Sequence, residues 1–522
     1  MNILRDIWKK TTLQYKYAFL GTIIFGILSQ GMGLFNKYSL HDDVQYFFHQ
    51  DNVLRWGRWA LHVLIKAEQH IFGDGNYSIP VINGSIVILC IAFSVCLLAD
   101  LFQIKSTMLC LMTAGVAVAF PGVTSLMGHM YTAHFYGLAL LFSVLGPYLI
   151  LKKARWYTIL PGIGFMVISA GIYQAYIPVM LSVFLFYLIK QFSDAEGKKQ
   201  RIVLYKQTGL IFVCGIAFVA LYFLFTKVFL DIYHETLISY KGIDSMGRLP
   251  LSDYFRRAVI SYREFLSPSS NNMYDVFPGT VHRLNFAVML LAVFLYGVLL
   301  YSRRRDPVCV LILCLLFLLI PLAVNFIFVM SDAADCNALM VYGKVMFFIF
   351  FAWLLERTAG SLSVMPDRVL KTICLGVLGV IVLMYCRFDN IMYLQMEMLQ
   401  TATTRYFSTL VTRIQDTEGY DSWKNVAFIG IPRPGRTDNS VENVQEMEHI
   451  VLPPVHYGLQ NALKVQWRNY MKYWCGYTPH EVDPYLYIDR PEVEAMPCYP
   501  DEGSIKVIDD VVVVKFTEKG AW

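Results

Sequence analysis

The chain has 522 residues, of which 56% are hydrophobic and only 16% are charged, and its mean hydropathy is +0.47. An average soluble domain carries roughly 25% charged residues, so this composition excludes a water-soluble globular protein. The abundance of apolar and aromatic residues also excludes a disordered chain. The net charge of +5 is too small to indicate a nucleic-acid partner, and the remaining class is a membrane protein.

Apolar stretches long enough to cross a bilayer recur along the first three quarters of the chain. A membrane-spanning helix needs about 20 apolar residues, and hydropathy predicts about eleven spans here. We expect the first to be a retained anchor, because it is too long for a signal peptide and no small-residue cleavage site follows it. The predicted spans are 17–35, 79–101, 107–123, 133–151, 156–169, 175–189, 208–230, 284–301, 308–330, 339–355 and 372–386.

Lysine and arginine mark one side of these spans. The short loops 125–132, 170–174 and 331–338 contain neither residue, whereas the loops on the other side are basic. Because positive charge stays on the cytoplasmic side, the N-terminus is expected inside, and an odd number of spans places the C-terminus outside. We therefore expect a multi-pass protein of the inner (plasma) membrane. The basic inner-loop residues are Lys152, Lys153, Arg155, Lys198, Lys199, Arg201, Lys206, Arg303, Arg304, Arg305, Arg357, Arg368 and Lys371.

The expected fold is an all-α polytopic membrane protein with a small α/β domain outside the membrane. Residues 1–386 form the membrane domain, which includes two large outer loops, 36–78 and 231–283. Residues 387–522 form the extracytoplasmic domain, where apolar spacing predicts a helix over 388–416 and strands over 426–431 and 511–516. Cys475 and Cys498 lie in this domain, where a disulfide is chemically permitted, but the sequence does not reveal their geometry.

Two adjacent carboxylates, Asp42 and Asp43, closely follow the first span. They either cap the helix that follows, because acids favour helix N-termini, or supply a general base near the lipid headgroups, and both roles can coexist. Residues 44–72 mix Trp, Tyr and basic residues, which is typical of an amphipathic helix in the outer leaflet. Arg55 and Arg58 are expected on one face of that helix. These arginines either bind lipid headgroups in general or bind one particular phosphate through bidentate hydrogen bonds.

Further polar residues gather at the predicted outer ends of the spans, where an outward-facing cavity would bring them together with the acidic pair. Lys344 lies about one turn inside a span, and an ionisable residue there is a functional candidate. Its alternatives are snorkelling to the interface or pairing with Asp335. The outer loop around Glu264 either orders over a ligand or remains a solvated loop. The other candidate substrate-binding residues are His129, His134, Tyr173, Gln174, Asp332 and Asp335.

Three features of the sequence together resemble the bacterial O-antigen glucosyltransferase (Gtr) family. They are the acidic pair after the first span, the sequence Gly57-Arg58-Trp59, and the sequence SAGIYQA at 169–175. These serotype-converting enzymes are similar in plan to the GT-C glycosyltransferases. The resemblance covers roughly residues 15–385, and residues 426–430 of the tail are in keeping with it.

The resemblance implies transfer of a hexose, expected to be glucose, from a polyprenyl-phosphate donor such as undecaprenyl-phosphate glucose to a surface glycan such as O-antigen. It implies that Asp42 or Asp43 is the general base, with Asp42 favoured. Arg55, Arg58 and Lys344 then bind the donor phosphate, and a single displacement inverts the anomeric centre. A monophosphate leaving group makes little demand for a metal, so we expect no metal and no cofactor.

Other functions remain open at this stage. A lipid-linked-sugar transporter or flippase would carry inverted repeats and helices broken at the midplane, and the sequence shows no such repeat. A related enzyme acting on protein or lipid A, or a non-catalytic assembly factor, is also compatible with the sequence. Phosphate-binding glycine loops, nucleophile elbows and zinc-ligand spacings are absent, which argues against cytosolic ATP-driven chemistry.

Overall fold

The computed structural model describes residues 11–39, 41–46, 53–73, 77–238, 249–266, 279–333, 336–358, 367–432 and 460–518. The chain divides into two compact units. The first consists of Met1–Lys37, Gln50–Asp74 and Ile79–Ile391, and the second of Tyr38–His49, Gly75–Ser78 and Met392–Trp522. The second unit thus combines the C-terminal region with the residues around the acidic pair, which the sequence assigned to the membrane domain.

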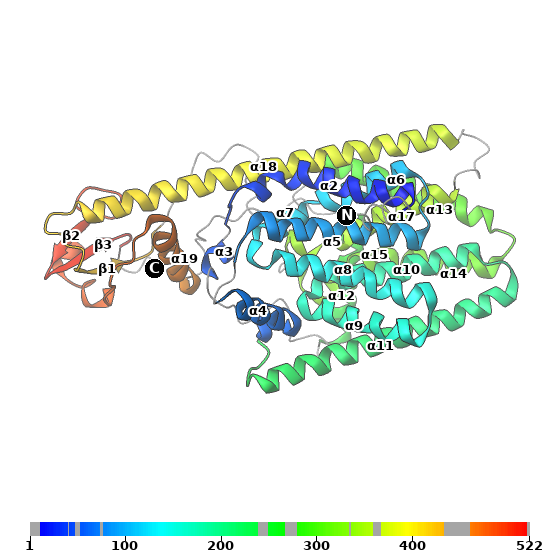
Figure 1. Ribbon diagram of the computed structural model, residues 1–522, viewed down its shortest axis with the longest axis horizontal. Coiled ribbons are helices and arrows are strands. Elements are labelled where there is room, and N and C mark those ends of the chain that lie inside the picture. The colour runs from blue at the N-terminus through cyan, green and yellow to red at the C-terminus, as the bar shows by residue number, and fades with distance from the viewer. Residues whose placement is uncertain are drawn as a thin grey trace, which may run out of the picture. The chain divides into compact units, whose positions relative to one another are not determined.

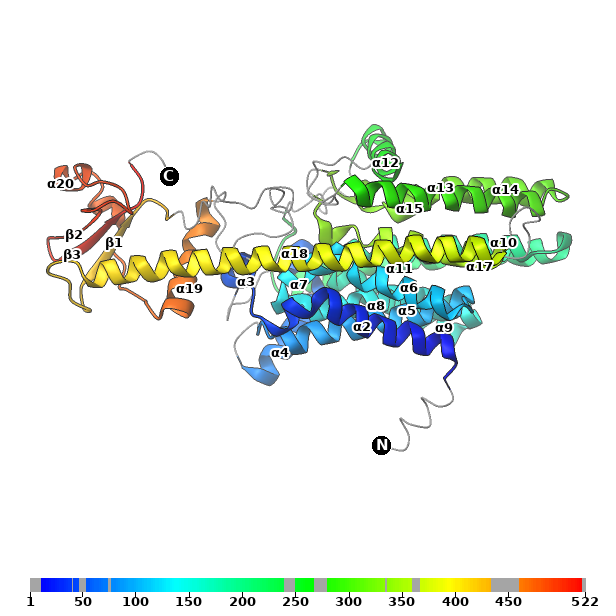
Figure 2. The ribbon, with the colours of Figure 1, turned by 90° about the horizontal axis from the view of Figure 1, so that it is seen from above.

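The first unit is a bundle of long apolar helices that run side by side (Figures 1 and 2). Among the described residues, nine helices are long and apolar enough to cross a membrane, in agreement with the polytopic, helical architecture predicted from the sequence. Two further predicted spans correspond to shorter helices, α9 (Trp156–Ile172) and α17 (Gly343–Thr358). The nine candidates are Leu13–Phe35 (α2), Pro80–Phe102 (α5), Thr107–Gly128 (α6 and α7), Met130–Lys153 (α8), Gln174–Asp194 (η2 and α10), Gly197–Ile232 (α11), Gly279–Ser302 (α13), Pro307–Val324 (α14 and α15) and Arg368–Gln415 (α18).

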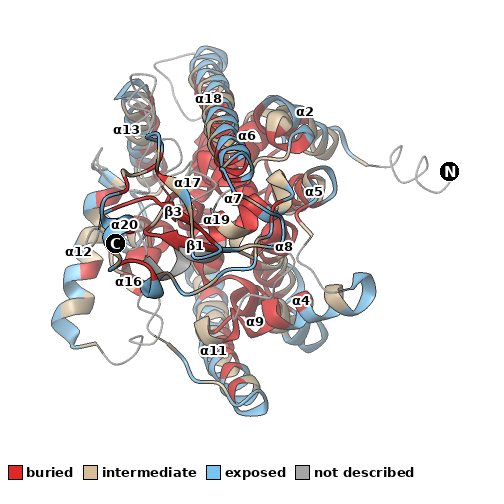
Figure 3. Ribbon diagram, turned by 90° about the vertical axis from the view of Figure 1, so that its left-hand side faces the viewer, coloured by how far each residue is buried: buried red, intermediate tan, exposed pale blue. Residues whose placement is uncertain are grey.

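Burial separates the inner helices of this unit from its outer ones. The most apolar window of Thr107–Gly128 is 89% buried, whereas that of Gly197–Ile232 is only 17% buried. Figure 3, viewed along the helices, accordingly shows α6 and α8 largely buried and much of α11 exposed. A helix that is apolar all round belongs in a core or in lipid. The exposed apolar face of α11, which includes Phe212 and Val213, is therefore suited to lipid contact.

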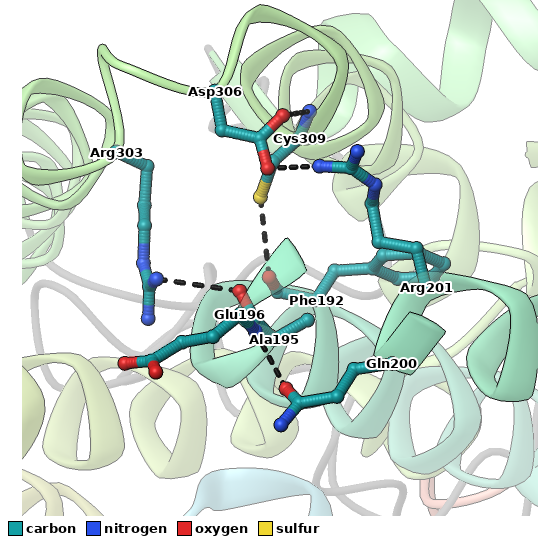
Figure 4. Close-up of polar contacts among 8 residues, drawn as sticks. All are labelled: Phe192, Ala195, Glu196, Gln200, Arg201, Arg303, Asp306 and Cys309. Carbon is teal, nitrogen blue, oxygen red and sulfur yellow. Dashed lines mark hydrogen bonds and ion pairs between the residues drawn. The ribbon is translucent and has the colours of Figure 1, made fainter. Parts of the chain in front are cut away.

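Two of the predicted inner loops meet at one end of the bundle (Figure 4). One loop joins α10 (Ile177–Asp194) to α11, and the other joins α13 to α14 (Pro307–Leu318). Asp306 caps α14 by accepting a hydrogen bond from the Cys309 N–H (3.2 Å), and it also pairs with Arg201. Arg303 donates to the Ala195 carbonyl (3.3 Å). These contacts place both basic loops on the same side of the bundle.

The predicted span over 308–330 needs correction, because it is not one continuous helix. It consists of α14, α15 (Ile320–Val324) and α16 (Ile327–Met330). Pro321 lies in the first turn of α15, and a proline provides no backbone N–H for a hydrogen bond to the preceding turn. Backbone groups freed at membrane depth require partners inside the protein.

Helix α12 (Leu251–Leu266), in the outer loop that the sequence left open, packs against α15 and α16 and donates hydrogen bonds to backbone carbonyls of the broken span. Arg257 donates to the carbonyls of Val329 and Met330 (3.3 Å each). The Ser261 hydroxyl donates to the Asn325 carbonyl (2.9 Å), and the Asn325 side chain donates back to the Ser261 carbonyl (3.1 Å). Helix α12 therefore completes the broken span.

The amphipathic pattern of α12 is reversed with respect to a helix of a soluble protein. Arg257, Ser261 and Glu264 are buried, whereas Leu251 is 87% exposed and Phe255 74% exposed. Polar residues facing the protein and apolar residues facing outward are the arrangement expected of a helix in the membrane interface. The segment is therefore not a solvated loop.

The second unit is built around a three-stranded sheet of order β1-β3-β2. Strand β1 (Asn425–Ile429) is parallel to β3 (Val511–Lys515), and β2 (Ile505–Ile508) is antiparallel to β3. Both predicted strand segments are thus strands. Helix α19 (Gln460–Cys475) and the end of α18 (Asp367–Gln415) pack on the sheet through a core. Its members include Phe407, Phe428, Trp467, Tyr470 and Phe516.

The structure corrects one prediction for this region and answers one question that the sequence left open. Helix α18 is continuous over 49 residues, although a span over 372–386 and a separate helix over 388–416 were predicted. Cys475 and Cys498 are free thiols and form no disulfide. The Cys475 sulfur lies 3.9 Å from the Ser408 hydroxyl, and the Cys498 sulfur lies 3.4 Å from a Glu518 carboxylate oxygen.

Candidate functional site

The two acids after the first span have different surroundings. Both lie in the first turn of the short helix α3 (His41–Gln45). Asp43 is fully buried, and its carboxylate accepts hydrogen bonds from the hydroxyls of Ser39 and Ser78 (2.9 Å each). Asp42 is partly exposed. Because two hydroxyls hold Asp43 inside the fold, Asp42 is the more accessible carboxylate for an incoming substrate.

Helix α3 is anchored to the C-terminal part of the second unit. The Asn469 side chain, on α19, donates to the carbonyls of Val44 (3.1 Å) and Gln45 (3.3 Å). Gln466, also on α19, donates to the Gln45 side chain (3.0 Å), and the fully buried Val44 joins the core between sheet and helices. The C-terminal region therefore fixes the position of the acidic pair.

The prediction of one amphipathic helix over 44–72 needs correction, because helical structure is interrupted at Gly57. Gly57 has φ of 73°, in the left-handed region that glycine adopts without strain. It separates the turn η1 (Val53–Trp56) from α4 (Trp59–Phe72), and residues 47–52 lie outside the described part. Arg55 and Arg58 consequently do not share a helix face. Arg55 lies 3.6 Å from the Glu235 carboxylate, while Arg58 turns toward an aromatic cluster.

Arg58 is enclosed by aromatic rings and is only 8% exposed. Its guanidinium donates to the Tyr136 hydroxyl (3.0 Å) and lies 5.4 Å from the Trp56 ring and 5.1 Å from the Tyr173 ring. Such cation–π contacts gain strength where water is excluded. Tyr136 and Tyr173 also stack on each other, with ring centroids 4.5 Å apart. We call these four residues the arginine cage.

The two sequence motifs meet beside the arginine cage. Gln174 donates to the Trp56 carbonyl (3.0 Å) and to the Tyr222 hydroxyl (3.0 Å), and Tyr222 in turn donates to the Gly57 carbonyl (3.2 Å). A β-carbon on Gly171 would lie 2.6 Å from the Trp59 ring, so only glycine fits there. The segment around 57–59 is therefore held against the segment 169–175.

A group of charged and aromatic side chains holds α4 in place. The His134 ring nitrogen lies 3.5 Å from the Glu68 carboxylate. His62 is buried and contacts the Tyr233 ring edge-on (4.6 Å). Burial lowers the pKa of His62, and the nearby Lys66 lowers it further, while Glu235 opposes the shift. His62 is therefore predominantly neutral near pH 7.

The remaining predicted site residues are scattered. His129 ends α7 (Pro121–Gly128), where its Nδ1 lies 3.0 Å from the Ser125 carbonyl oxygen. Asp332 lies 3.6 Å from the Arg256 guanidinium of α12. Asp335 lies outside the described residues. Lys344 alone among the predicted site residues lines a cavity between α12, α13 and α17.

That cavity has a volume of about 420 Å³ and lies where α13 and α17 begin and α12 ends. By the orientation predicted from the loop charges, this is the outer end of the bundle. Glu264, which is fully buried, accepts two hydrogen bonds from Arg263 (3.0 and 2.7 Å). The lining consists of Phe120, Glu264, Phe265, Leu266, His282, Arg283, Asn285, Phe286, Met289, Lys344, Phe347, Phe348 and Tyr385.

Sequence reasoning missed His282, Arg283 and Tyr385 as cavity residues. One signal was present for Arg283, because a basic residue directly before an outer span end runs against the usual charge bias. No comparable signal marks Tyr385, whose hydroxyl donates to the Asn285 side chain (3.3 Å). Within the described ranges, no cluster of three or more His, Cys, Asp and Glu side chains could hold a metal ion.

Comparison with protein families decides the class of this chain. The family model for glucosyl transferase GtrII matches residues 31–348. The chain belongs to the GtrII glucosyl transferase family. The resemblance inferred from the motifs is thereby confirmed, and the GtrII match includes the acidic pair, the arginine cage and Lys344. No curated protein and no solved structure shows significant similarity to the chain.

Proposed function

We propose that the protein transfers glucose from a polyprenyl-phosphate donor to a cell-surface glycan such as O-antigen. The observation that carries this proposal is the GtrII match, which supports glucosyl transfer. The apolar helices among the described residues support a donor carried by a lipid, since such a donor shares the bilayer with the enzyme. The proposed plan is that of a GT-C enzyme in the inner membrane, with the N-terminus in the cytoplasm and the C-terminal domain outside.

The proposed reaction is a single displacement. The acceptor hydroxyl oxygen attacks the anomeric carbon, and the bond from that carbon to the phosphate oxygen breaks, so that its electron pair stays on the polyprenyl phosphate. The acceptor proton passes to a carboxylate acting as general base. Asp42 is our candidate for this base, because it is partly exposed whereas Asp43 is fully buried. Attack opposite the leaving group inverts the anomeric centre.

Charge develops on the leaving phosphate as the bond breaks, and fixed cations stabilise such charge effectively where water is excluded. Lys344 is the predicted cation that lines a cavity. Arg55 and Arg58 were predicted for the same task, and their contacts with Glu235 and with the arginine cage favour a role in holding this region in shape.

The test uses purified full-length protein in lipid nanodiscs with undecaprenyl-phosphate glucose and a glycan acceptor. Replacing a general base typically lowers the rate by about 10²–10⁴-fold, so we expect Asp42→Asn to lose transfer to that extent while the protein still folds. Intact transfer by an Asp42→Asn, Asp43→Asn double variant would refute the proposed base. Absence of both transfer and hydrolysis with every polyprenyl-phosphate sugar would favour a transporter.

A further inference from the structure

One part of the cavity wall is cationic. Arg283 lies in the first turns of α13, and Lys344 is the second residue of α17. Glu264 is the one carboxylate in the lining as described, and Arg263 binds it through two hydrogen bonds. With Arg283 and Lys344 against this one carboxylate, the lining carries a net positive charge. Arginine and lysine are the side chains that bind phosphate groups best.

The other part of the wall is apolar. Phe265, Leu266, Phe286, Met289, Phe347 and Phe348 all contribute to it. A hydrocarbon chain covers such a surface and gains free energy by burial. The combination of walls fits an anionic group attached to a hydrocarbon chain.

The apolar wall continues onto the outside of the protein. Leu266 and Phe286 line the cavity and are also 52% and 49% exposed. Leu266 ends the outward face of α12, on which Leu251 and Phe255 are still more exposed. An exposed apolar surface on an interfacial helix contacts lipid chains in a membrane. A lipid-borne ligand can therefore reach the cavity sideways from the bilayer.

We propose that this cavity binds the phosphate and the first isoprene units of the polyprenyl-phosphate carrier, with Lys344 and Arg283 on the phosphate. This assignment rests on the proposed function, which supplies the class of donor, and it adds the binding site. The donor is a phosphodiester with one negative charge, and the carrier left after transfer is a monoester with up to two. Two fixed cations therefore hold the carrier more tightly once the sugar has left.

The experiment measures undecaprenyl phosphate binding to the full-length protein in phosphatidylcholine nanodiscs by native mass spectrometry. Lys344→Gln and Arg283→Gln should each weaken binding by about tenfold or more, the size expected for losing a hydrogen bond to a charged group. Lys344→Arg should retain most of the affinity. Lys227→Gln is the matched control. Lys227 is an exposed basic residue near the C-terminus of α11, which is also predicted to be at the outer end of the bundle, and it lies outside the cavity lining.

Two further ligands test whether the phosphate is required and whether an ordinary phospholipid binds equally well. Undecaprenol, which lacks the phosphate, should bind weakly and equally to all variants. Phosphatidylglycerol should compete poorly; competition as strong as that of undecaprenyl phosphate, with the same loss in both variants, would overturn the assignment in favour of a general headgroup site.

The remaining outcomes distinguish failure of the site from failure of the function. Wild-type affinity in both Gln variants would overturn the site while leaving the donor class intact. No binding of undecaprenyl phosphate to the wild-type protein would overturn both. Arg283 is exposed, so its substitution leaves the test decisive even where Lys344→Gln fails to fold.

Discussion

Replacing Gly171 by alanine probes the contact between the two family motifs. Gly171 is the penultimate residue of α9, and an added β-carbon would lie 2.6, 2.8 and 2.9 Å from three atoms of the Trp59 indole. The indole cannot withdraw easily, because it stacks on Phe225 (5.0 Å) and Phe229 (5.2 Å), both at an interplanar angle of 19°. The substitution must therefore displace Trp59 or shift the helix.

The expected change in unfolding free energy combines two effects of a glycine-to-alanine change. Adding a methyl group to a packed interior costs about 1–3 kcal/mol. Gly164 on the same helix is the matched control, since an alanine β-carbon there meets nothing within 4 Å. An unhindered glycine-to-alanine change in a helix stabilises by about 0.4–1 kcal/mol. We therefore expect Gly171→Ala to destabilise and Gly164→Ala to be neutral or stabilising, with the two variants about 1–4 kcal/mol apart.

The assay is the unfolding free energy in mixed micelles, read from the two purified variants and the wild-type protein under one set of conditions. Glucosyl transfer measured on the same samples should fall in Gly171→Ala, because Trp59 begins α4. Equal unfolding free energies in Gly171→Ala and Gly164→Ala would refute the account of the motif contact, and so would a gain in stability at position 171.

Two further predictions concern α3 and α4. Asn469→Ala removes the hydrogen-bond donor to the Val44 and Gln45 carbonyls and should lower the unfolding free energy by about 1–3 kcal/mol. Glucosyl transfer should fall, whereas binding of undecaprenyl phosphate should be kept. Lys472→Ala, an exposed change on the same helix, should alter neither transfer nor binding. For His62, burial keeps the pKa in the folded state below its ordinary 6.5, so the stability that its neutral form contributes is present above about pH 6.5 and is lost as the pH falls. His62→Gln should therefore lose less thermal stability than the wild-type protein between about pH 7 and pH 5, and an unchanged pH profile would contradict this.

The sequence predicted the helical architecture well because membrane spans are encoded locally. A run of apolar residues at α5 or α11 determines its helix without reference to distant contacts. The break near Pro321 was harder to foresee, because a proline in a span is tolerated whenever neighbouring groups satisfy the backbone. Those groups are on α12, whose tertiary role no hydropathy window reveals.

The candidate site was predicted only in part, for a similar reason. Lys344 was found because a charge inside an apolar run is conspicuous in one dimension. The face-sharing of Arg55 and Arg58 failed because it assumed a continuous helix, and Gly57 interrupts that helix through its positive φ. The difference between Asp42 and Asp43 depends on Ser78, which lies 35 residues away from Asp43 and comes close only in the fold.

The contacts between α12 and the broken span also impose an order on biogenesis. Helix α12 precedes α14 in the chain, so its polar face is synthesised before the carbonyls of Asn325, Val329 and Met330 that it binds. A carbonyl without a partner in hydrocarbon costs several kcal/mol. Arg257 of α12 supplies the carbonyls of Val329 and Met330 with a hydrogen-bond partner that the apolar run itself does not provide. These hydrogen bonds can form only after both segments have been synthesised, so we expect completion of this span to be a step of tertiary folding.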